Sequence, residues 1–308
     1  MAQRALMKLV WSKEAAKANR QGRPLVALET SVLAQGLPHP HNLEAARRCE
    51  AAIREAGATP AAMAVIDGRL HVGLDAEGTE RLATGAGLLK IGSRDLAVAI
   101  ATKATGGTTV SATCELAAHA GISVFATGGL GGVHRGVAHD LDISQDLPAL
   151  ARWPVAVVCA GAKSVLDLPK TLELLETLGV PVIGVATNEL PGFYSRETGL
   201  PLEHSVPNAK VAAAVVDARL SLGQGGLIFA VPPPEATALP RAEIERHLEA
   251  ALKLARVRRV SGKAVTPFLL GEMVRRTKGR TLAANLALLE NNARFAAQVA
   301  VARHRHAR

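Results

Sequence analysis

Short apolar runs, often rich in valine and isoleucine, alternate with amphipathic stretches along this chain, and no other feature restricts its fold as strongly. Such alternation is typical of a parallel sheet whose strands are joined by helices. The runs predict strands at Leu25–Glu29, Ala62–Ile66, Ser123–Thr127, Val155–Cys159, Val182–Ala186 and Leu227–Ala230.

The stretches between these strands have the periodicity of helices. Apolar residues recur every three or four positions in Asn42–Ala56, as they do on one face of a helix. The last helix is expected from Thr281 to about His304, because its apolar residues keep the same spacing. Further helices are expected at Arg94–Lys103, Cys114–Ala120, Leu168–Leu178, Ala209–Leu222 and Arg241–Arg256.

Three consecutive prolines, Pro232–Pro234, form the clearest break, since they end a strand and begin a rigid connection toward the C-terminal helices. No internal repeat or low-complexity linker divides the chain. We therefore expect a single α/β domain over residues 1–308, with the C-terminal helices folded back against the sheet. Asn285 and Asn292 share one edge of the last helix's apolar stripe, and each needs either a backbone partner, which we prefer, or a ligand.

The charge of the chain allows two kinds of partner. A formal net charge of +9 and a pI near 9.9 would suit a nucleic-acid-binding protein. The excess lies on scattered helix faces and in the tail Arg303–Arg308, however, and aromatic residues make up only 3% of the chain, which leaves few rings for base stacking. A phosphorylated small-molecule substrate accounts for the same charge, and we predict no nucleic-acid partner.

The sequence also bears on location. No apolar run reaches the roughly 18 residues of a membrane span, so no membrane contact is expected. Met1–Arg20 lacks the apolar core and cleavage site of a secretion signal. Cys49, Cys114 and Cys159 lie far apart, which indicates free thiols rather than disulfides or a zinc site. We expect a cytoplasmic protein.

Two reactive side chains fall beyond the carboxyl ends of predicted strands, where open α/β sheets bind ligands. Glu29 closes an apolar strand and suits a general acid or base, although a solvated strand end fits the pattern equally. Lys163 follows the strand Val155–Cys159 among small residues and precedes a helix. Desolvation and the positive helix end would favour the neutral amine that a nucleophile needs, whereas most lysines at strand ends are solvated.

A glycine-rich segment, Lys103–Thr113, leads into a helix. Its hydroxyl groups and the first N–H groups of the helix are suited to hold phosphate. It is not a P-loop, because the Gly-Lys-Ser/Thr ending is missing.

A second glycine-rich segment, Ala126–Gly136, is followed by Asp140, Asp142 and Asp146. Alternating carboxylates can hold a hard divalent cation. Ser144, in the same run, is a candidate helix N-cap. We assign His134 and His139 to loop stabilisation rather than to metal binding.

Taken in order, these segments resemble the pseudouridine-5′-phosphate glycosidases, also called the indigoidine synthase A-like family. The resemblance covers nearly the whole chain and holds at every position that carries chemistry. The matching segments are ALETSVLAQGLPHPHN (27–42), KATGGTTVSAT (103–113), FATGGLGGVHRG (125–136), DISQDL (142–147), CAGAKSVLDLPKTLE (159–173), VATNELPGFY (185–194), GKAVTPFLL (262–270) and ANLALLENNA (284–293).

The resemblance implies a three-layer α/β/α sandwich and a homotrimer. It implies an enzyme that reversibly cleaves the C–C glycosidic bond of pseudouridine 5′-phosphate, giving uracil and ribose 5-phosphate through a lysine Schiff base. Glu29 would be the proton donor and Lys163 the nucleophile. Asp142 would bind a divalent metal, Mn²⁺, with water supplying most ligands. The residues implied in substrate contact are Lys90, Val110, Ser144, Gln145 and Asp146, with Asn285 as a further site residue.

Two alternatives stay open. A Schiff-base lyase or aldolase acting on another sugar phosphate would use the same lysine without a uracil pocket. A basic nucleic-acid-binding protein would show salt-dependent binding and no turnover.

Overall fold

A computed structural model describes residues 8–260 and 265–306, so Gly262–Ala264 of the matched segment 262–270 and the last two residues of the basic tail lie outside it. Eleven strands form one sheet in the order β1-β4-β3-β2-β7-β8-β11-β9-β10, with β6 joining β3 to β5. The strands are β1 (Leu9–Trp11), β2 (Leu25–Leu28), β3 (Thr59–Ile66), β4 (Arg69–Val72), β5 (Leu89–Ile91), β6 (Gly106–Thr108), β7 (Val124–Ala126), β8 (Ala156–Cys159), β9 (Val182–Val185), β10 (His204–Val206) and β11 (Leu227–Ala230).

The strands from β3 through β2 to β10 are all parallel to their neighbours along this order. On its other edge β3 is antiparallel to β4 and β6. All six predicted strands are confirmed, while the five others were missed. Parallel pairing brings the carboxyl ends of β2, β7 and β8 to one edge of the sheet.

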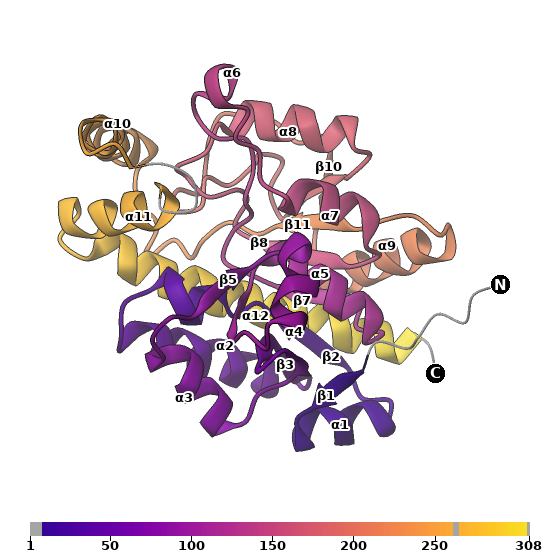
Figure 1. The fold of residues 1–308 in the computed structure, drawn as a ribbon. Helices are drawn as coiled ribbons and strands as arrows, with labels where there is room; N and C mark the ends of the chain where they lie inside the picture. The colour runs from indigo at the N-terminus through magenta and orange to yellow at the C-terminus, as the bar shows by residue number, and fades with distance from the viewer. Residues whose placement is uncertain (1–7, 261–264, 307–308) are drawn as a thin grey trace.

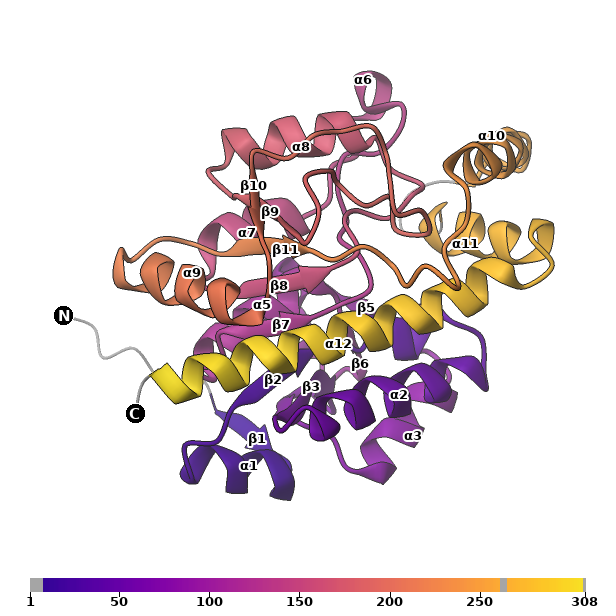
Figure 2. The same ribbon diagram turned by 180° about the vertical axis from the view of Figure 1, so that it is seen from behind.

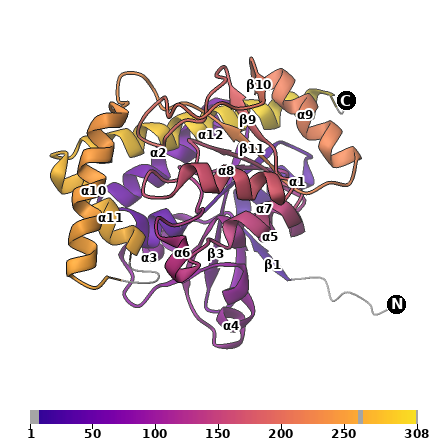
Figure 3. The same ribbon diagram turned by 90° about the horizontal axis from the view of Figure 1, so that it is seen from above.

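Helices cover both faces of the sheet. Figure 2 shows α12 (Arg280–His306) across one face, beside α2 (His41–Glu55) and α9 (Ala209–Ser221). The other face carries α5 (Val110–His119), α7 (Asp146–Arg152) and α8 (Leu168–Thr177) (Figure 1). The remaining helices are α1 (Lys13–Arg20), α3 (Ala76–Thr84), α4 (Leu96–Ala101), α6 (Val137–Asp140), α10 (Arg241–Val257) and α11 (Val265–Arg276). Figure 3 shows α10 and α11 side by side at one end of the molecule.

Successive side chains of β2 point to opposite faces of the sheet and belong to two separate core layers. Val26 and Leu28 belong to the core beneath α12, whereas Ala27 belongs to the core beneath α5 and α7. Successive side chains of a strand point to opposite faces, so a strand buried on both sides reads as a continuous apolar run. The expected three-layer α/β/α sandwich, with C-terminal helices packed on the sheet, is confirmed.

The glycines of the segment Lys103–Thr113 lie in strand β6, which the sequence pattern did not predict. A Cβ atom on Gly106 would collide with the carbonyl group of Leu89, and one on Gly107 with that of Thr30. The absent side chains therefore let β6 lie tightly between β5 and the end of β2. The helix that follows begins at Val110, four residues before the predicted start at Cys114.

The prediction for Arg94–Lys103 was also too long. This stretch contains a 3₁₀ turn, Ser93–Asp95, followed by the short helix α4. The long C-terminal helix, by contrast, begins within one residue of its expected start. No helix within residues 8–260 and 265–306 is long and apolar enough to cross a membrane.

Candidate active site

A cavity of about 550 Å³ lies beyond the carboxyl ends of β2 and β8. Its wall includes every residue that the resemblance assigned to catalysis, to substrate or to metal. These are Glu29, Lys90, Val110, Asp142, Ser144, Gln145, Asp146 and Lys163. Residues more than 130 positions apart in the chain, such as Glu29 and Lys163, therefore meet at one site.

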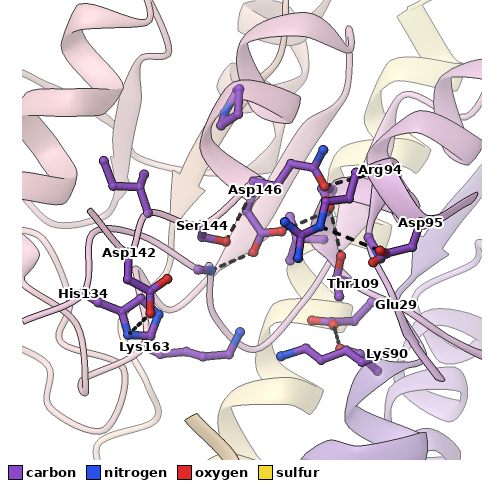
Figure 4. A pocket seen from close by; sticks show the side chains of 18 of the residues that line it. Glu29, Lys90, Arg94, Asp95, Thr109, His134, Asp142, Ser144, Asp146 and Lys163 are labelled. Carbon is purple, nitrogen blue, oxygen red and sulfur yellow. Dashed lines mark hydrogen bonds and ion pairs between the residues drawn. The ribbon is translucent and has the colours of Figure 1, made fainter. Parts of the chain in front are cut away.

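Glu29 follows the last residue of β2 and is half-buried. Both oxygens of its carboxyl group accept hydrogen bonds from hydroxyl groups: the Ser31 hydroxyl donates to Oε2, and the Thr127 hydroxyl donates to Oε1. Figure 4 shows the carboxyl group directed into the cavity. The orientation of this side chain is thus fixed by two donors from different parts of the chain.

Lys163 lies in the loop between β8 and α8 and is half-buried. Its backbone N–H donates to the Leu130 carbonyl at 3.0 Å, which fixes the loop against the second glycine-rich segment. Figure 4 shows its amine pointing into the cavity toward that of Lys90, rather than away from the site. Two amines at one wall make the cavity attractive to an anion.

The positive end of α8, expected to act on Lys163, is partly neutralised. Asp167 is the N-cap of this helix, and its carboxylate accepts the backbone N–H of Lys170 at 3.2 Å. The environment of Lys163 therefore owes less to the helix dipole than the sequence pattern suggested.

An anion cradle forms where α5 begins. Thr109, Val110 and Ser111 line the cavity there, and the hydroxyl groups of Thr109 and Ser111 lie 3.0 Å apart. The first N–H groups of a helix have no partner within the helix, and the helix dipole adds positive potential. With Lys90 in the same wall, this end of the cavity suits a phosphate group.

Asp146 contacts the backbone of two site segments. Its buried carboxylate accepts the N–H of Ser111 at 3.0 Å and that of Gly131 at 2.8 Å. It therefore joins the start of α5 to the second glycine-rich segment. Asp146 thus both lines the cavity and holds the cradle in place. The adjacent Gln145 accepts the backbone N–H of Arg94 at 3.2 Å, which ties in a third segment.

Ser144 was predicted as the helix N-cap, and it lies one residue before the observed N-cap. Gln145 is the N-cap of α7, which begins at Asp146. The Ser144 hydroxyl nevertheless accepts the backbone N–H of Asp146 at 3.2 Å, so it satisfies one of the free donors of the first turn.

Asp142 lies at the rim of the cavity beside His134. The His134 Nδ1 atom is 3.7 Å from Asp142 Oδ2, and the backbone N–H of His134 donates to the Asp142 carbonyl at 3.0 Å. The described residues contain no group of three or more histidine, cysteine, aspartate or glutamate side chains placed to hold a metal. A cation at Asp142 would accordingly take most ligands from water. The side chains of His139 and Asp140 lie outside the described part of the chain.

A second, smaller cavity of about 60 Å³ adjoins the first, and Glu29 and Lys163 line both. Its wall combines the apolar Phe193 and Leu289 with the amides Gln35 and Asn285. Gln35 donates to the Leu88 carbonyl at 3.1 Å, but its buried Oε1 atom has no partner among the described residues. Apolar sides with a few polar groups are typical of sites for flat, polar ring systems.

The two asparagines of α12 have different roles. The buried Asn292 donates to the Thr127 carbonyl at 2.9 Å and to the Gly128 carbonyl at 3.4 Å, which confirms the backbone alternative for this residue. Asn285, which is 6% exposed, lines the second cavity instead. The site residues that sequence reasoning did not single out include Ser31, Gln35, Arg94 and Thr127, whereas Thr109 belongs to the segment whose hydroxyl groups were expected to hold phosphate.

A model of the indigoidine synthase A like protein family matches residues 14–302. The chain belongs to this family. Among similar members of the indigoidine synthase A-like family is the pseudouridine-5′-phosphate glycosidase of Myxococcus xanthus, 66% identical over 96% of this chain and 98% of the relative. That of Herpetosiphon aurantiacus is 51% identical over the same shares.

Two solved structures resemble the present one throughout. The prealnumycin C-glycosynthase AlnA, crystallised with ribulose 5-phosphate, has a TM-score of 0.89 and 37% identity, covering 97% of this chain and 98% of its own. An indigoidine synthase A-like protein from Thermotoga maritima has a TM-score of 0.87 and 36% identity, covering 98% of both chains.

Proposed function

We propose that this chain is a pseudouridine-5′-phosphate glycosidase, which reversibly cleaves the substrate to uracil and ribose 5-phosphate. The observation that carries the proposal is the placement of Glu29 and Lys163 in one cavity, beside an anion cradle at the start of α5. The similar proteins of Myxococcus xanthus and Herpetosiphon aurantiacus, which bear this name, support it.

A covalent route suits this bond. Simple protonation of a leaving nitrogen does not cleave a C–C glycosidic link, so a nucleophile is needed to divide the reaction into easier steps. Glu29 would protonate the ribose ring oxygen as the ring opens, while the Lys163 amine attacks C1′. Protonation of the uracil carbon then breaks the C–C bond, because the lysine nitrogen takes up the resulting positive charge as an iminium ion. Addition of water releases ribose 5-phosphate and regenerates the amine.

The substrate phosphate is assigned to the cradle. The N–H groups at the start of α5 other than that of Ser111, which donates to Asp146, would hold it together with the Thr109 and Ser111 hydroxyl groups and the Lys90 amine. Asp146 keeps this cradle in register with the second glycine-rich segment. Anchoring matters because correct positioning of reacting groups contributes up to roughly 7–11 kcal/mol to a reaction barrier.

The uracil ring is assigned to the second cavity, which adjoins Glu29 and Lys163. Uracil offers both N–H donors and carbonyl acceptors, so the Asn285 amide and the unpartnered Oε1 of Gln35 complement it. A sugar-phosphate aldolase has no need of such a pocket. We expect Asn285→Leu to weaken uracil-dependent turnover about 10- to 100-fold, while Schiff-base formation with ribose 5-phosphate persists, since a lost buried polar contact costs about 1–3 kcal/mol.

We further propose a divalent cation, Mn²⁺, at Asp142. A carboxylate with water ligands suits this hard cation, and His134 lies close enough to orient the carboxylate. When bound, it would add positive charge near the substrate phosphate. Chelation followed by titration with Mn²⁺ tests the assignment: Asp142→Asn should raise the concentration required for half-maximal activity, and activity that survives exhaustive chelation would contradict it.

We also propose that the chain forms a homotrimer and works in the cytoplasm. A homotrimer, three times 32.1 kDa, follows from the family resemblance and is measurable by light scattering. Three buried, unbridged thiols are consistent with the reducing cytoplasm. Because strands from both halves of the chain share one sheet, we also propose that the chain works as one domain.

The proposed reaction is tested by supplying pseudouridine 5′-phosphate and following uracil and ribose 5-phosphate together. Equal release of both products, absent in Lys163→Ala, is expected. Ribose 5-phosphate, fructose 6-phosphate and uridine 5′-phosphate serve as comparison substrates. Cleavage of a plain sugar phosphate into smaller aldehydes, with no uracil released, would favour the aldolase; salt-dependent RNA or DNA binding without turnover would favour the nucleic-acid-binding alternative.

A further inference from the structure

We propose that Thr127 is a positioning residue for Glu29, holding its carboxyl group at the angle required for proton transfer to the substrate. This assignment rests on the proposed function, in which Glu29 is the proton donor. Thr127 belongs to the second glycine-rich segment, and no step of the proposed reaction involves its hydroxyl group directly.

The contact between the two side chains is direct. The Thr127 hydroxyl donates to Oε1 of Glu29, while the Ser31 hydroxyl donates to Oε2. Ser31 lies only two residues from Glu29 and moves with the same segment. Thr127 follows β7, the neighbouring strand, so its hydrogen bond orients Glu29 from outside this segment.

Thr127 itself is rigidly held. It is 2% exposed, and its backbone N–H donates to the Val158 carbonyl of β8 at 3.0 Å. Its carbonyl accepts the side-chain amide of Asn292, a fully buried residue of α12, at 2.9 Å. The backbone of Thr127 is therefore fixed from two directions, by the next strand of the sheet and by the helix that covers it.

The backbone around Glu29 is also fixed, which leaves rotation of the side chain as the remaining freedom. The N–H of Thr30 donates to the Thr108 carbonyl at 3.3 Å, and its hydroxyl donates to the Met63 carbonyl at 2.6 Å. The terminal torsion of a glutamate is broad, so donors at its oxygens are what set the plane of the carboxyl group. Proton transfer depends on that plane, because the acid must lie within hydrogen-bond reach of the atom it protonates.

Thr127 acts from behind the site and not on the substrate. Glu29 lines both the large cavity and the adjoining one, whereas Thr127 is absent from the described lining of either. Thr127 and Glu29 share a separate cavity of about 30 Å³, lined by Leu28, Cys49 and Leu289 among others. It has no room for a substrate.

The test exchanges the hydroxyl group while keeping the shape of the side chain. Thr127→Val removes the donor, and Thr127→Ser retains it. Thr277→Val is the matched control: Thr277, which follows α11, is 3% exposed, and its hydroxyl donates to the Met273 carbonyl of that helix at 2.7 Å. For each variant, kcat and KM for pseudouridine 5′-phosphate, the melting temperature and a crystal structure are determined.

We expect Thr127→Val to lower kcat about 10- to 100-fold with KM changed less than about threefold, since general acid catalysis contributes roughly 10²–10⁴-fold and its orientation is only partly lost. Thr127→Ser and Thr277→Val should stay within about threefold of the unaltered enzyme. In the crystal structure of Thr127→Val, the Glu29 carboxyl group should be rotated or present in several orientations.

Thr127→Val with an unchanged kcat, or Thr127→Ser reduced as strongly as Thr127→Val, would overturn the assignment. So would a Thr127→Val structure in which Glu29 keeps its place, whatever the substrate proves to be. Failure of the unaltered enzyme to release uracil would instead contradict the proposed function, and the crystallographic comparison would still decide the role of Thr127.

Discussion

At the scale of single residues, the site combines a carboxyl group and two amines in the wall of one cavity. Glu29, Lys163 and Lys90 are each half-buried, so they contact the ligand space while the sheet edge excludes part of the solvent. Interactions between charged or polar groups strengthen as water is removed, and fixed donors need no reorganisation during the reaction. The position of each group is set by a short strand: Glu29 and Lys163 follow β2 and β8, and Lys90 lies in β5.

Replacing the carboxyl group should separate catalysis from folding. We expect Glu29→Ala to lower turnover at least about 100-fold, because the proton donor is lost. Its melting temperature should stay close to that of the unaltered chain, since Glu29 is half-buried and outside the apolar core. Uracil release and thermal melting monitored by circular dichroism measure the two effects. Turnover retained in Glu29→Ala would remove this residue from its role.

The three thiols should be unreactive in the folded chain. Burial raises the pKa of Cys49 and of Cys159 to about 12 and that of Cys114 well above its ordinary value. Only the thiolate reacts, and a thiol with a pKa near 12 is ionised to roughly one part in 10⁴ at pH 8. Iodoacetamide at pH 8, followed by mass spectrometry, should modify all three in urea and none of them under native conditions. Rapid native labelling of Cys159, next to the site, would contradict the structure.

Charge and strand position revealed part of this site in the sequence. Glu29 and Lys163 stand out because a charged residue directly after an apolar run is conspicuous. Thr127 closes a run in the same way, but a hydroxyl group gave no comparable signal. Lys90 lies within β5, a strand of three residues with no recognisable pattern, and was found only through the family resemblance.

At the scale of elements, α12 connects the core to the site. Its buried face covers β2, β7 and β8, its Asn292 holds the backbone after β7, and its Asn285 lines the second cavity. Its outer edge is joined to α2 by ion pairs, Arg48 to Glu290 at 2.8 Å and Arg294 to Glu55 at 3.0 Å. The position of this helix therefore affects both stability and catalysis.

The ion pairs between α2 and α12 should give a pH-dependent contribution to stability. Burial raises the pKa of Glu290, but hydrogen bonds from Arg48 and Arg294 outweigh it, and the net pKa is lowered. A lowered carboxyl pKa stabilises the folded state fully above the unfolded value, about 4.3, and less as the pH falls through the folded value.

Glu290→Gln should accordingly destabilise the chain by about 1 kcal/mol at pH 7, a value that allows for partial exposure to solvent. The difference from the unaltered chain should shrink below pH 4. Urea unfolding at several pH values measures it, with Glu176→Gln on the exposed face of α8 as control. A difference that stays constant down to pH 3 would show that the ion pairs are not its origin.

Elements with a clear apolar run or period were predictable, and elements without one were not. The apolar stripe of α12 extends over several turns, so its period was unambiguous. β5 and β6 have three residues each, and β6 contains two glycines that are required by close backbone approach rather than by any period. The start of α5 was missed because its first turn, Val110–Thr113, continues a glycine-rich stretch that reads as a loop.

At the scale of the whole molecule, the order of the strands assembles the site. Residues near positions 29, 127 and 163 meet because β2, β7 and β8 are neighbours in the sheet, although β3 to β6 intervene in the chain. Strand order is set by packing between distant segments, which local periodicity does not encode. The family resemblance supplied what periodicity could not, and Figure 2 shows the helix layer that holds these strands together.

The central claim is that Lys163, and not the neighbouring Lys90, forms the covalent bond to the sugar. The decisive measurement is reduction with borohydride in the presence of ribose 5-phosphate, followed by peptide mass spectrometry of the unaltered chain, Lys90→Ala and Lys163→Ala. We predict an adduct on the peptide that contains Lys163, retained in Lys90→Ala and absent from Lys163→Ala. An adduct on Lys90, or no adduct in a preparation that turns over its substrate, would contradict the mechanism.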